Sequence, residues 1–327
     1  MKLRTTIEQW TLKAPFRITG YVWDRIEVLV VEIESEGRVG RGEAAGVYYK
    51  NDKPPSMRKQ IESLRRTIEA GITREALQRL LPPGGARNAV DCALWDLEAK
   101  LDAREAWRSA GLSRIDPLVT TMTCGADEPA KMAAAANGFG DVRAIKLKLT
   151  GEPVDAARVR AVREAKPDVW LGVDGNQGFT RAALEKLLPT LGEARVSLIE
   201  QPFPVGQEAW LDEVFSPIPI AADESVQCLI DIEPLVGRFQ VINIKLDKCG
   251  GLTEGLAMAR KARDLGLDCM VGNMIGTSLA MAPALLVGQL CKVVDLDGPA
   301  FITSDRENPV RYEDGYISCP DALWGCP

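Results

Sequence analysis

From Pro117 onward the sequence alternates between short apolar runs of strand length and segments with helical periodicity, and this alternation limits the possible folds more than any other feature. The helical segments, such as 155–165, 181–191 and 253–266, carry Ala and Leu at spacings of three and four. Strands and helices that alternate in this way over roughly 180 residues predict a parallel (β/α)8 barrel. The eight predicted strands are 118–123, 144–149, 169–173, 196–199, 218–222, 241–246, 267–271 and 293–296.

A doubly wound open sheet is the alternative with the same alternation. That fold would need a glycine-rich phosphate turn after an early strand, and the sequence has neither GxGxxG nor GxxxxGK[ST] there. The barrel is therefore the favoured architecture.

The N-terminal part has a different pattern. Runs at 3–12, 25–34 and 39–44 favour three antiparallel strands, and helical periodicity follows from Pro54, with its longest apolar stripe over 86–101. The last residues, from Phe301, have no helical period. We therefore expect an α+β capping domain over 1–115, completed by the returning tail 300–327, and a catalytic (β/α)8-type barrel over 116–299.

Composition restricts the chemistry. The chain has no histidine, which excludes Ser-His-Asp and Cys-His arrangements and histidine-bound zinc. A net charge of -6 without long runs of one sign argues against nucleic acid and a membrane surface as partners, and favours a small polar molecule. The eight cysteines form no CxxC pair, and no apolar run has signal-peptide or membrane-spanning length, so we expect a soluble cytoplasmic protein with reduced thiols.

Lys146 and Lys148 stand two apart in the run VRAIKLKLT, so both ammonium groups leave the same face of the predicted strand. An edge strand with lysines turned to water would give the same pattern. Burial and a neighbouring cation both disfavour a charged lysine, so Lys146 would hold Lys148 below its free pKa. A lysine of that kind is suited to act as a general base.

Charged residues follow most of the other predicted strands, at the end where barrel enzymes carry their functional groups. Asp174, Glu200 and Asp223 would meet at the barrel mouth, where three carboxylates repel one another unless a cation joins them. Each alone could be a turn residue, a lysine partner or a helix cap, but together they predict a Mg²⁺ site. Lys148 and Lys245 would face a substrate carboxylate on that ion from opposite sides, so that one removes an α-proton and the other returns it.

A set of motifs has the order and spacing found in one known family: KLK at 146–148, the acids at 174, 200 and 223, Lys245 with Cys249-Gly250-Gly251, and the segment ARNAVDCALWDLEAK at 86–100. With these motifs the chain resembles the enolase superfamily, in its muconate-lactonizing subgroup, over essentially its whole length. The resemblance implies a capped barrel, Mg²⁺ held by the three acids, and acid–base catalysis by lysines.

Asp295 and Asp297, after the eighth predicted strand, resemble the motif with which dipeptide epimerases of the L-Ala-D/L-Glu type bind the α-ammonium group of their substrate. A helix-capping turn is the alternative. The resemblance implies a dipeptide epimerase that acts through an enediolate, and by analogy a homo-oligomer. N-acylamino acid racemases and o-succinylbenzoate synthases would use the same lysines and metal without a need for the two aspartates. Muconate cycloisomerisation and non-catalytic binding on a degenerate barrel are weaker alternatives.

Glutamate-selective relatives carry arginines in a loop of the cap that closes over the substrate side chain. Here Gly20 and Trp23 stand where those arginines are expected, with Arg25 close by. Loss of a cation argues against an acidic side chain. Tyr21 and Trp23 favour an apolar or aromatic C-terminal residue in the substrate, whereas Asp24 leaves a cationic one open; the two aromatics could also be packing anchors of the loop.

Overall fold

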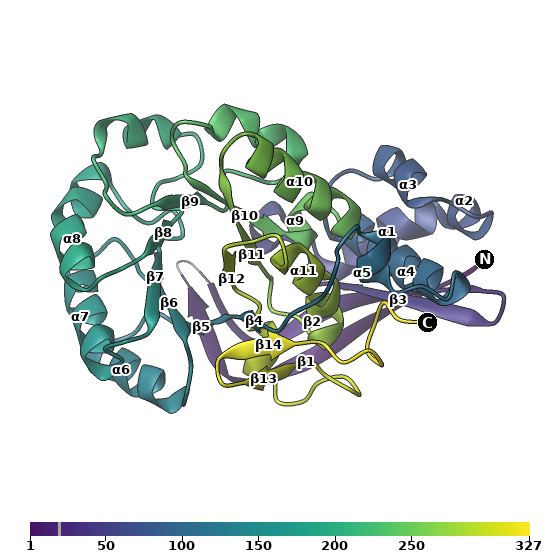
Figure 1. Cartoon of the computed structure of the whole chain (residues 1–327), viewed down its shortest axis with the longest axis horizontal. Coiled ribbons are helices and arrows are strands. Elements are labelled where there is room, and N and C mark those ends of the chain that lie inside the picture. The colour runs from purple at the N-terminus through teal and green to yellow at the C-terminus, as the bar shows by residue number, and fades with distance from the viewer. Residues whose placement is uncertain (19–20) are drawn as a thin grey trace.

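The computed structural model describes residues 1–18 and 21–327, with the backbone alone at residues 17, 18 and 21. An antiparallel N-terminal unit and a parallel barrel lie side by side, and both ends of the chain lie on the N-terminal unit (Figure 1). The (β/α)8-type barrel with an α+β unit, expected from the sequence, is confirmed.

The N-terminal sheet has the order β1 (Lys2–Ile18), β2 (Tyr21–Ser35), β3 (Arg38–Ala44), with each strand antiparallel to the next. Alternate residues of β2, including Leu29 and Val31, are fully buried against helix α4 (Gly85–Leu101). The helix can approach closely because Gly42 on β3 has no side chain: a Cβ there would lie 2.1 Å from the carbonyl oxygen of Ala89. The smaller helices of this unit are η1 (Tyr48–Lys50), α1 (Pro54–Ser63), α2 (Arg65–Glu69), α3 (Arg74–Leu80) and α5 (Ala106–Ser109).

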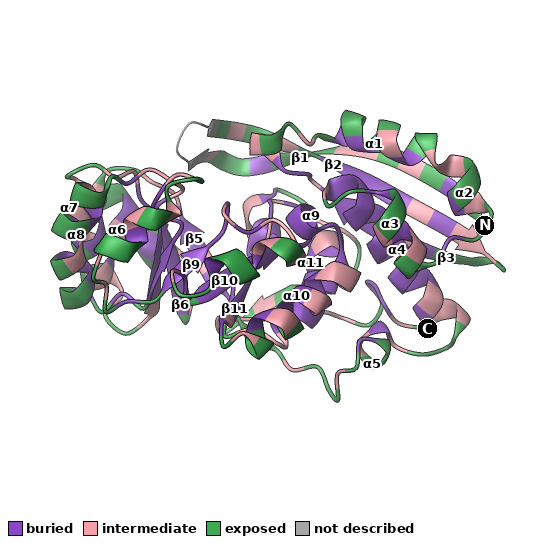
Figure 2. Cartoon of the chain, turned by 90° about the horizontal axis from the view of Figure 1, so that it is seen from above, coloured by how far each residue is buried: buried purple, intermediate pink, exposed green. Residues whose placement is uncertain are grey.

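The segment 16–25, expected to be a loop, is mostly strand. Phe16 pairs with Trp23 and Ile18 pairs with Tyr21, so β1 and β2 continue as a hairpin past a register shift between Thr11 and Phe16. This hairpin extends from the N-terminal unit toward the barrel (Figure 2). The loop expected from the resemblance is therefore replaced over most of its length by backbone pairing between β1 and β2. Gly20, one of the two positions where an arginine was expected, lies outside the described residues.

The barrel sheet has eight parallel strands, ordered β5 to β12 around the ring. The strands are β5 (Thr121–Cys124), β6 (Ala144–Lys148), β7 (Trp170–Asp174), β8 (Leu198–Glu200), β9 (Ile220–Ala222), β10 (Val241–Lys245), β11 (Asp268–Gly272) and β12 (Val293–Val294). The helices around them are α6 (Pro129–Gly138), α7 (Asp155–Ala165), α8 (Arg181–Glu193), α9 (Leu246–Cys249), α10 (Leu252–Asp264) and α11 (Ser278–Gly288), with 3-10 turns η2 (Glu208–Glu213), η3 (Leu229–Asp231), η4 (Glu233–Leu235) and η5 (Gly298–Phe301). The last strand is shorter than expected and ends immediately before Asp295.

Side chains close the seam between the first and eighth barrel strands, since no backbone ladder joins β5 to β12 among the described strands. Thr121 Oγ1 donates a hydrogen bond to Asp295 Oδ1 at 2.5 Å, and the Thr123 N–H donates to Asp297 Oδ2 at 2.7 Å. The two aspartates that the sequence assigned to substrate binding therefore also hold the ring together.

The C-terminal tail contacts both parts of the molecule. Strands β13 (Arg311–Glu313) and β14 (Tyr316–Ser318) add to β4 (Leu118–Val119), the short strand that precedes the barrel. Further on, Trp324 Nε1 donates to the carbonyl oxygen of Arg41 at 2.9 Å, and the Gly325 N–H donates to Asp96 Oδ1 at 2.7 Å. The division into domains 1–115, 116–299 and the tail 300–327 stays a prediction.

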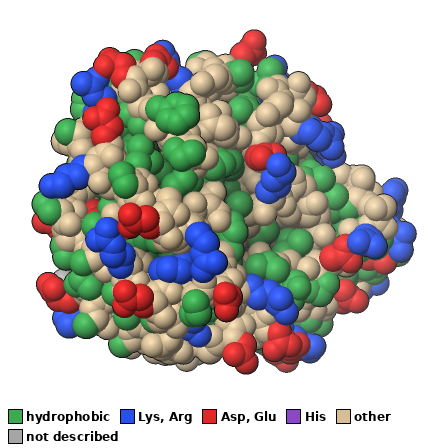
Figure 3. Space-filling view, turned by 60° about the vertical axis from the view of Figure 1, so that its left-hand side comes forward, with side chains coloured by type: hydrophobic (Ala, Val, Ile, Leu, Met, Phe, Trp, Pro, Cys, Tyr) green, Lys and Arg blue, Asp and Glu red, His purple; other side chains and the backbone are tan. Residues whose placement is uncertain are grey.

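On the face drawn in Figure 3, acidic and basic side chains are interspersed. Among the described residues no helix is both long and apolar enough to cross a membrane. All eight cysteines fall within the described part of the chain, and none is in a disulfide.

Candidate active site

A cavity of about 380 Å³ lies where the carboxyl ends of the barrel strands face the N-terminal unit. The barrel side of its lining carries charged groups: Lys146, Lys148, Lys245, Asp295 and Asp297. The opposite side carries four aromatic residues, from the β1–β2 hairpin, from η1 and from η5: Phe16, Trp23, Tyr48 and Phe301. Charged residues of the N-terminal unit also line it: Arg25, Glu27, Asp52 and Lys53. The cavity therefore joins a charged floor to an aromatic wall that also carries charged residues.

Three carboxylates end adjacent strands below this cavity. Asp174 on β7 and Glu200 on β8 are partners in the parallel ladder, and Asp223 directly follows β9. Their exposed fractions are 0%, 0% and 2%. In the described part of the chain, no three acidic or cysteine side chains converge closely enough to chelate a metal as they stand. Each of these carboxylates is instead in ion-pair range of a lysine ammonium group.

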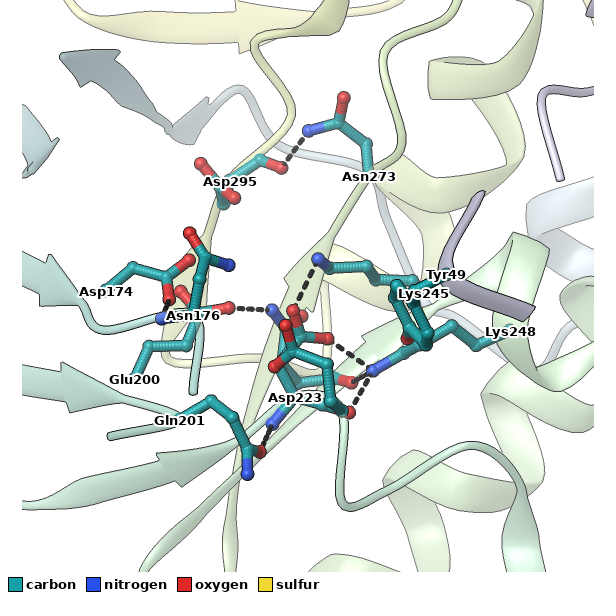
Figure 4. Close-up of polar contacts among 12 residues, drawn as sticks. Tyr49, Asp174, Asn176, Glu200, Gln201, Asp223, Lys245, Lys248, Asn273 and Asp295 are labelled. Atoms are coloured by element: carbon teal, nitrogen blue, oxygen red, sulfur yellow. Dashed lines mark hydrogen bonds and ion pairs between the residues drawn. The ribbon is translucent and has the colours of Figure 1, made fainter. Parts of the chain in front are cut away.

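The lysines predicted to be catalytic are those cations. Lys148 Nζ lies 2.6 Å from Asp174 Oδ2. Lys245 Nζ lies 2.7 Å from Asp223 Oδ2 (Figure 4). Lys148 leaves β6 and Lys245 leaves β10, and β7, β8 and β9 separate these strands, so the two ammonium groups stand on opposite walls of the eight-stranded ring. Both side chains line the cavity.

Burial and charge set the protonation of this cluster. Burial, together with the nearby Asp174, raises the pKa of Glu200 to about 7. Burial opposes the charge on Asp223, but Lys245 and Lys248 hold the pKa of that carboxyl well below its usual range. Burial also opposes the charge on Lys245, but Asp223 and Glu200 hold its pKa well above the ordinary value. In this arrangement Lys245 is an ammonium group and Asp223 is its carboxylate.

Lys146, the first lysine of the KLK motif, lies deeper and toward the seam. Its ammonium group is in close contact with Asp295 Oδ2, and it lies 3.2 Å from Glu200 Oε2 and 3.9 Å from Asp174 Oδ2. Burial opposes its charge, but Asp295 and Glu200 hold the pKa of Lys146 well above the ordinary value. Glu200 Oε2 is in ion-pair range of Lys146 yet accepts no hydrogen bond.

Asp297 differs from Asp295. Burial, with repulsion from Asp295, raises the pKa of Asp297 to about 6. Burial also acts on Asp295, but Lys146 holds the pKa of that carboxyl below its usual range. The structure thus brings both aspartates to the cavity, in two different electrostatic settings.

Two polar residues of this site were missed in the sequence. Lys248 is buried and donates to Asp223 Oδ1 at 2.5 Å and to the carbonyl oxygen of Asn243 at 3.0 Å. Asn243 Nδ2 donates to Glu200 Oε1 at 2.7 Å. Period two in the run INIK puts Asn243 on the face of Lys245, and that signal could have identified it. Lys248 gave no such signal because it follows the strand, in α9.

The motifs at 86–100 and 249–251 contact one another. Arg87 on α4 donates to the carbonyl oxygen of Cys249 at 2.5 Å and to that of Gly250 at 3.2 Å. Gly251 has φ +117°, and a Cβ there would lie 2.6 Å from the Cβ of Asp91. The two glycines therefore let α4 pack directly on the turn that follows Lys245.

Of the residues predicted to set substrate specificity, the structure describes the side chains of Trp23 and Arg25. Trp23 and Arg25 line the cavity, and Arg25 Nε lies 3.3 Å from Asp24 Oδ1. Trp23 stacks edge-on with Tyr48 at 5.1 Å between ring centroids. The side chain of Tyr21 is outside the described part of the chain.

Comparison with known families matches the chain in two parts. Residues 1–105 match the N-terminal domain of mandelate racemase / muconate lactonizing enzyme, and residues 126–324 match the enolase C-terminal domain-like family. Together these matches span most of the sequence.

Two relatives are 37% identical to this chain. One is the L-Ala-D/L-Glu epimerase of Escherichia coli, which aligns over 95% of this chain and 97% of its own. The other is the N-acetyl-D-glutamate racemase of a Pseudoalteromonas species, which aligns over 91% and 95%.

Two solved structures share the fold. An enolase family member from Agrobacterium tumefaciens with homology to dipeptide epimerases, solved with bound sodium and L-Ala-L-Glu, is 40% identical, with a TM-score of 0.96 and 99% of both chains covered. The dipeptide epimerase of Enterococcus faecalis, complexed with Mg and L-Leu-L-Tyr, is 27% identical, with a TM-score of 0.91 and 99% and 98% covered. The chain therefore belongs to the enolase superfamily, in its mandelate racemase and muconate-lactonizing group.

Proposed function

We propose that this protein is a Mg²⁺-dependent dipeptide epimerase that inverts the α-carbon of the C-terminal residue of a dipeptide by 1,1-proton transfer. The observation that carries the proposal is the position of Lys148 and Lys245 on opposite walls of one cavity, next to buried carboxylates and Asp297. The names of the Escherichia coli and Enterococcus faecalis relatives and the dipeptide in the Agrobacterium tumefaciens structure support it.

The carboxylates fit a magnesium ion in their chemistry. All three donors are oxygens, they come from adjacent strands, and Glu200 Oε2 is buried without a hydrogen bond. Asp174, Glu200 and Asp223 would hold the ion. When bound, it would stabilise the negative charge that develops on the substrate carboxylate as the α-proton leaves.

The proton transfers fall to the two cavity lysines. One lysine must be neutral and the other charged at the start of a turnover, and each turnover exchanges these states, so that the α-proton leaves on one face and a proton returns on the other. Exposed fractions of 8% for Lys148 and 7% for Lys245 limit the contact of both amines with bulk water. Lys146 would offset the charge of the enediolate from the seam side.

We propose that Trp23, Arg25 and Tyr21 contact the side chain of the C-terminal residue. The aromatic wall supports an apolar or aromatic residue, as the sequence suggested, whereas Arg25 offers a guanidinium group to an acidic one. The preference for a residue other than glutamate stays a prediction.

Racemisation of N-acylamino acids is the second candidate, favoured by the Pseudoalteromonas relative. Such substrates lack the α-ammonium group, so Asp297 would face a neutral acyl chain. A buried carboxylate whose partners are one backbone N–H and a distant amide, with no cation of the described residues against it, is costly, and this cost favours the dipeptide. The cytoplasmic location and the homo-oligomer expected from the sequence are proposals as well.

Deuterium uptake from D₂O tests the function directly. The protein is incubated with Mg²⁺ and a mixed library of L,L-dipeptides, and a parallel sample contains N-acylamino acids. We expect one deuteron to enter a subset of dipeptides with inversion of the α-carbon, with loss of uptake in EDTA. Lys148→Ala and Lys245→Ala should each lose inversion, because the lysine that remains can exchange the α-proton only on its own face. Lys131→Ala, at an exposed lysine, is the matched control. Uptake on N-acylamino acids without uptake on any dipeptide would refute the proposal and favour the racemase.

A further inference from the structure

Part of the aromatic wall belongs to the segment that follows β3. Residues 45–53 leave the N-terminal sheet, form the turn η1 and lead into α1. Five of them line the cavity: Ala45, Gly46, Tyr48, Asp52 and Lys53. Tyr48 also stacks edge-on with Trp23, at 5.1 Å between ring centroids. The position of this segment therefore sets how closely the wall approaches the charged floor.

A buried carboxylate of the barrel holds the start of this segment. Asp247 is 6% exposed, and its Oδ1 accepts the Gly46 N–H at 2.8 Å. The Ala45 N–H also interacts with this carboxylate. Gly46 has φ +80°, and a Cβ there would lie 2.3 Å from the carbonyl oxygen of Asp52, so glycine is required at this turn. The carboxylate of Asp247 therefore fixes a tight turn at the point where the segment leaves the sheet.

Asp247 also belongs to the turn that carries one of the two cavity lysines. It lies two residues after Lys245, in the first turn of α9. Tyr48 and Tyr49 of the segment interact electrostatically with Lys245. Asp247 itself is not among the described residues that line the cavity. It can therefore act on a substrate only through the segment that it holds.

We infer that Asp247 is a positioning residue that sets the preference for the C-terminal side chain of the substrate from outside the cavity, by holding the segment 45–53 against the barrel. This inference rests on the proposed function. A carboxylate suits the task, because hydrogen bonds to charged acceptors are stronger than those between neutral groups. The segment keeps a separate bond, from Gln227 Nε2 to the Tyr49 hydroxyl at 3.0 Å, so loss of Asp247 would loosen the wall without removing it.

Hydrogen exchange followed by mass spectrometry tests the hold on the segment without a substrate. In Asp247→Ala the amides of 45–53 should exchange about 10- to 100-fold faster than in the wild type, the factor that corresponds to a lost hydrogen bond to a charged group. Asp247→Asn keeps one acceptor oxygen, so its exchange should be intermediate, and this variant carries the test if the alanine variant does not fold. Asp91→Asn is the matched control, because Asp91 is a buried carboxylate that accepts a backbone N–H outside the segment, that of Thr253 at 2.9 Å.

Substrate preference is the second readout. We compare kcat/KM for the best dipeptide with a large C-terminal side chain with kcat/KM for L-Ala-L-Ala, whose small side chain makes little contact with the wall. The ratio of the two values does not depend on how much of the enzyme is folded. Asp247→Ala should lower this ratio about tenfold, the lower end of what one methylene group contributes to discrimination in a pocket. Asp91→Asn should leave the ratio unchanged.

The outcomes separate this inference from the proposed function. Unchanged exchange over 45–53 in both Asp247 variants would overturn the inference, and so would faster exchange with an unchanged ratio. Absence of deuterium uptake in the wild type on every dipeptide would overturn the proposed function, and the role in substrate preference with it. The exchange experiment would then still decide whether Asp247 holds the segment.

Discussion

Replacement of Lys248 by methionine should destabilise the protein in the absence of divalent cations. Lys248 is 2% exposed. Its ammonium group donates to Asp223 Oδ1 at 2.5 Å, to the Asp223 carbonyl oxygen at 2.6 Å and to the Asn243 carbonyl oxygen at 3.0 Å. Methionine fills a similar volume but makes none of these bonds, so Asp223 and two carbonyl groups lose a buried donor.

The magnitude follows from the partners that remain. Removal of one member of a buried ion pair costs about 3–5 kcal/mol. Asp223 keeps Lys245 at 2.7 Å, which places the loss at the lower end. We therefore expect the free energy of unfolding to fall by about 3 kcal/mol. In large domains each kcal/mol shifts the melting midpoint by at least about 2 °C, so the midpoint should fall by about 6 °C.

Thermal melts in EDTA, followed by circular dichroism, test this value. Lys292→Met is the control, because its ion pair with Asp268 is exposed and such pairs contribute little. Mg²⁺ should then raise the midpoint of Lys248→Met more than that of the wild type, since binding to the native state restores a cation to Asp223. A midpoint in EDTA equal to that of the wild type would refute the reasoning that Lys248 is a buried structural cation.

Three further predictions concern the packing and the titration of buried groups. Gly251→Ala should lower the free energy of unfolding by about 1–3 kcal/mol, because the new Cβ would lie 2.6 Å from the Cβ of Asp91. Gly192→Ala in α8 is the control, because no atom lies within 4 Å of the new Cβ, and it should be neutral or stabilising by up to about 1 kcal/mol. Urea melts measure both values. Burial raises the pKa of Asp91 from 3.8 to about 6, so the folded chain holds this proton more tightly than the unfolded chain does. The protonated Asp91 therefore contributes to the stability of the fold below pH 3.8, and this contribution is lost as pH rises through about 6. Asp91→Asn should therefore flatten the dependence of stability on pH in that window, and an unchanged curve would contradict the assignment. Burial and Asp295 raise the pKa of Asp297 to about 6, so kcat/KM for dipeptides should fall as pH drops through that value, because a protonated carboxyl group cannot pair with the substrate ammonium; a pH-independent kcat/KM from pH 5 to 7 would argue against that role.

Local periodicity was enough to predict the barrel and the faces of its strands. Period two placed Lys146 and Lys148 on one face of β6, and both are found there, buried at 4% and 8% exposure. The stripe of α4 was predicted in the same way, and the helix begins and ends within one residue of the expected range. These features depend on neighbours in the chain, so the sequence alone determined them.

Other features depend on which distant segments meet, and periodicity does not contain that information. The segment 16–25 pairs as a hairpin because β1 and β2 supply the register. Lys248 reaches Asp223 because the neighbouring strands β9 and β10 bring the residues that follow them together. Sequence spacing likewise gave no sign that Arg87 would lie on the turn at Gly250.

Asp295 and Asp297 show the same limit at the level of charge. They are the same residue type, two apart, and in the sequence they are equivalent. Closure of the ring puts Lys146 against Asp295 and leaves Asp297 with a backbone amide and a distant side-chain amide, so the two carboxyl groups differ in pKa and in free acceptors. The sequence determined that acids and lysines would gather at one end of a barrel, and only the tertiary structure decided which charge neutralises which, because electrostatic energy depends on distance and burial in three dimensions.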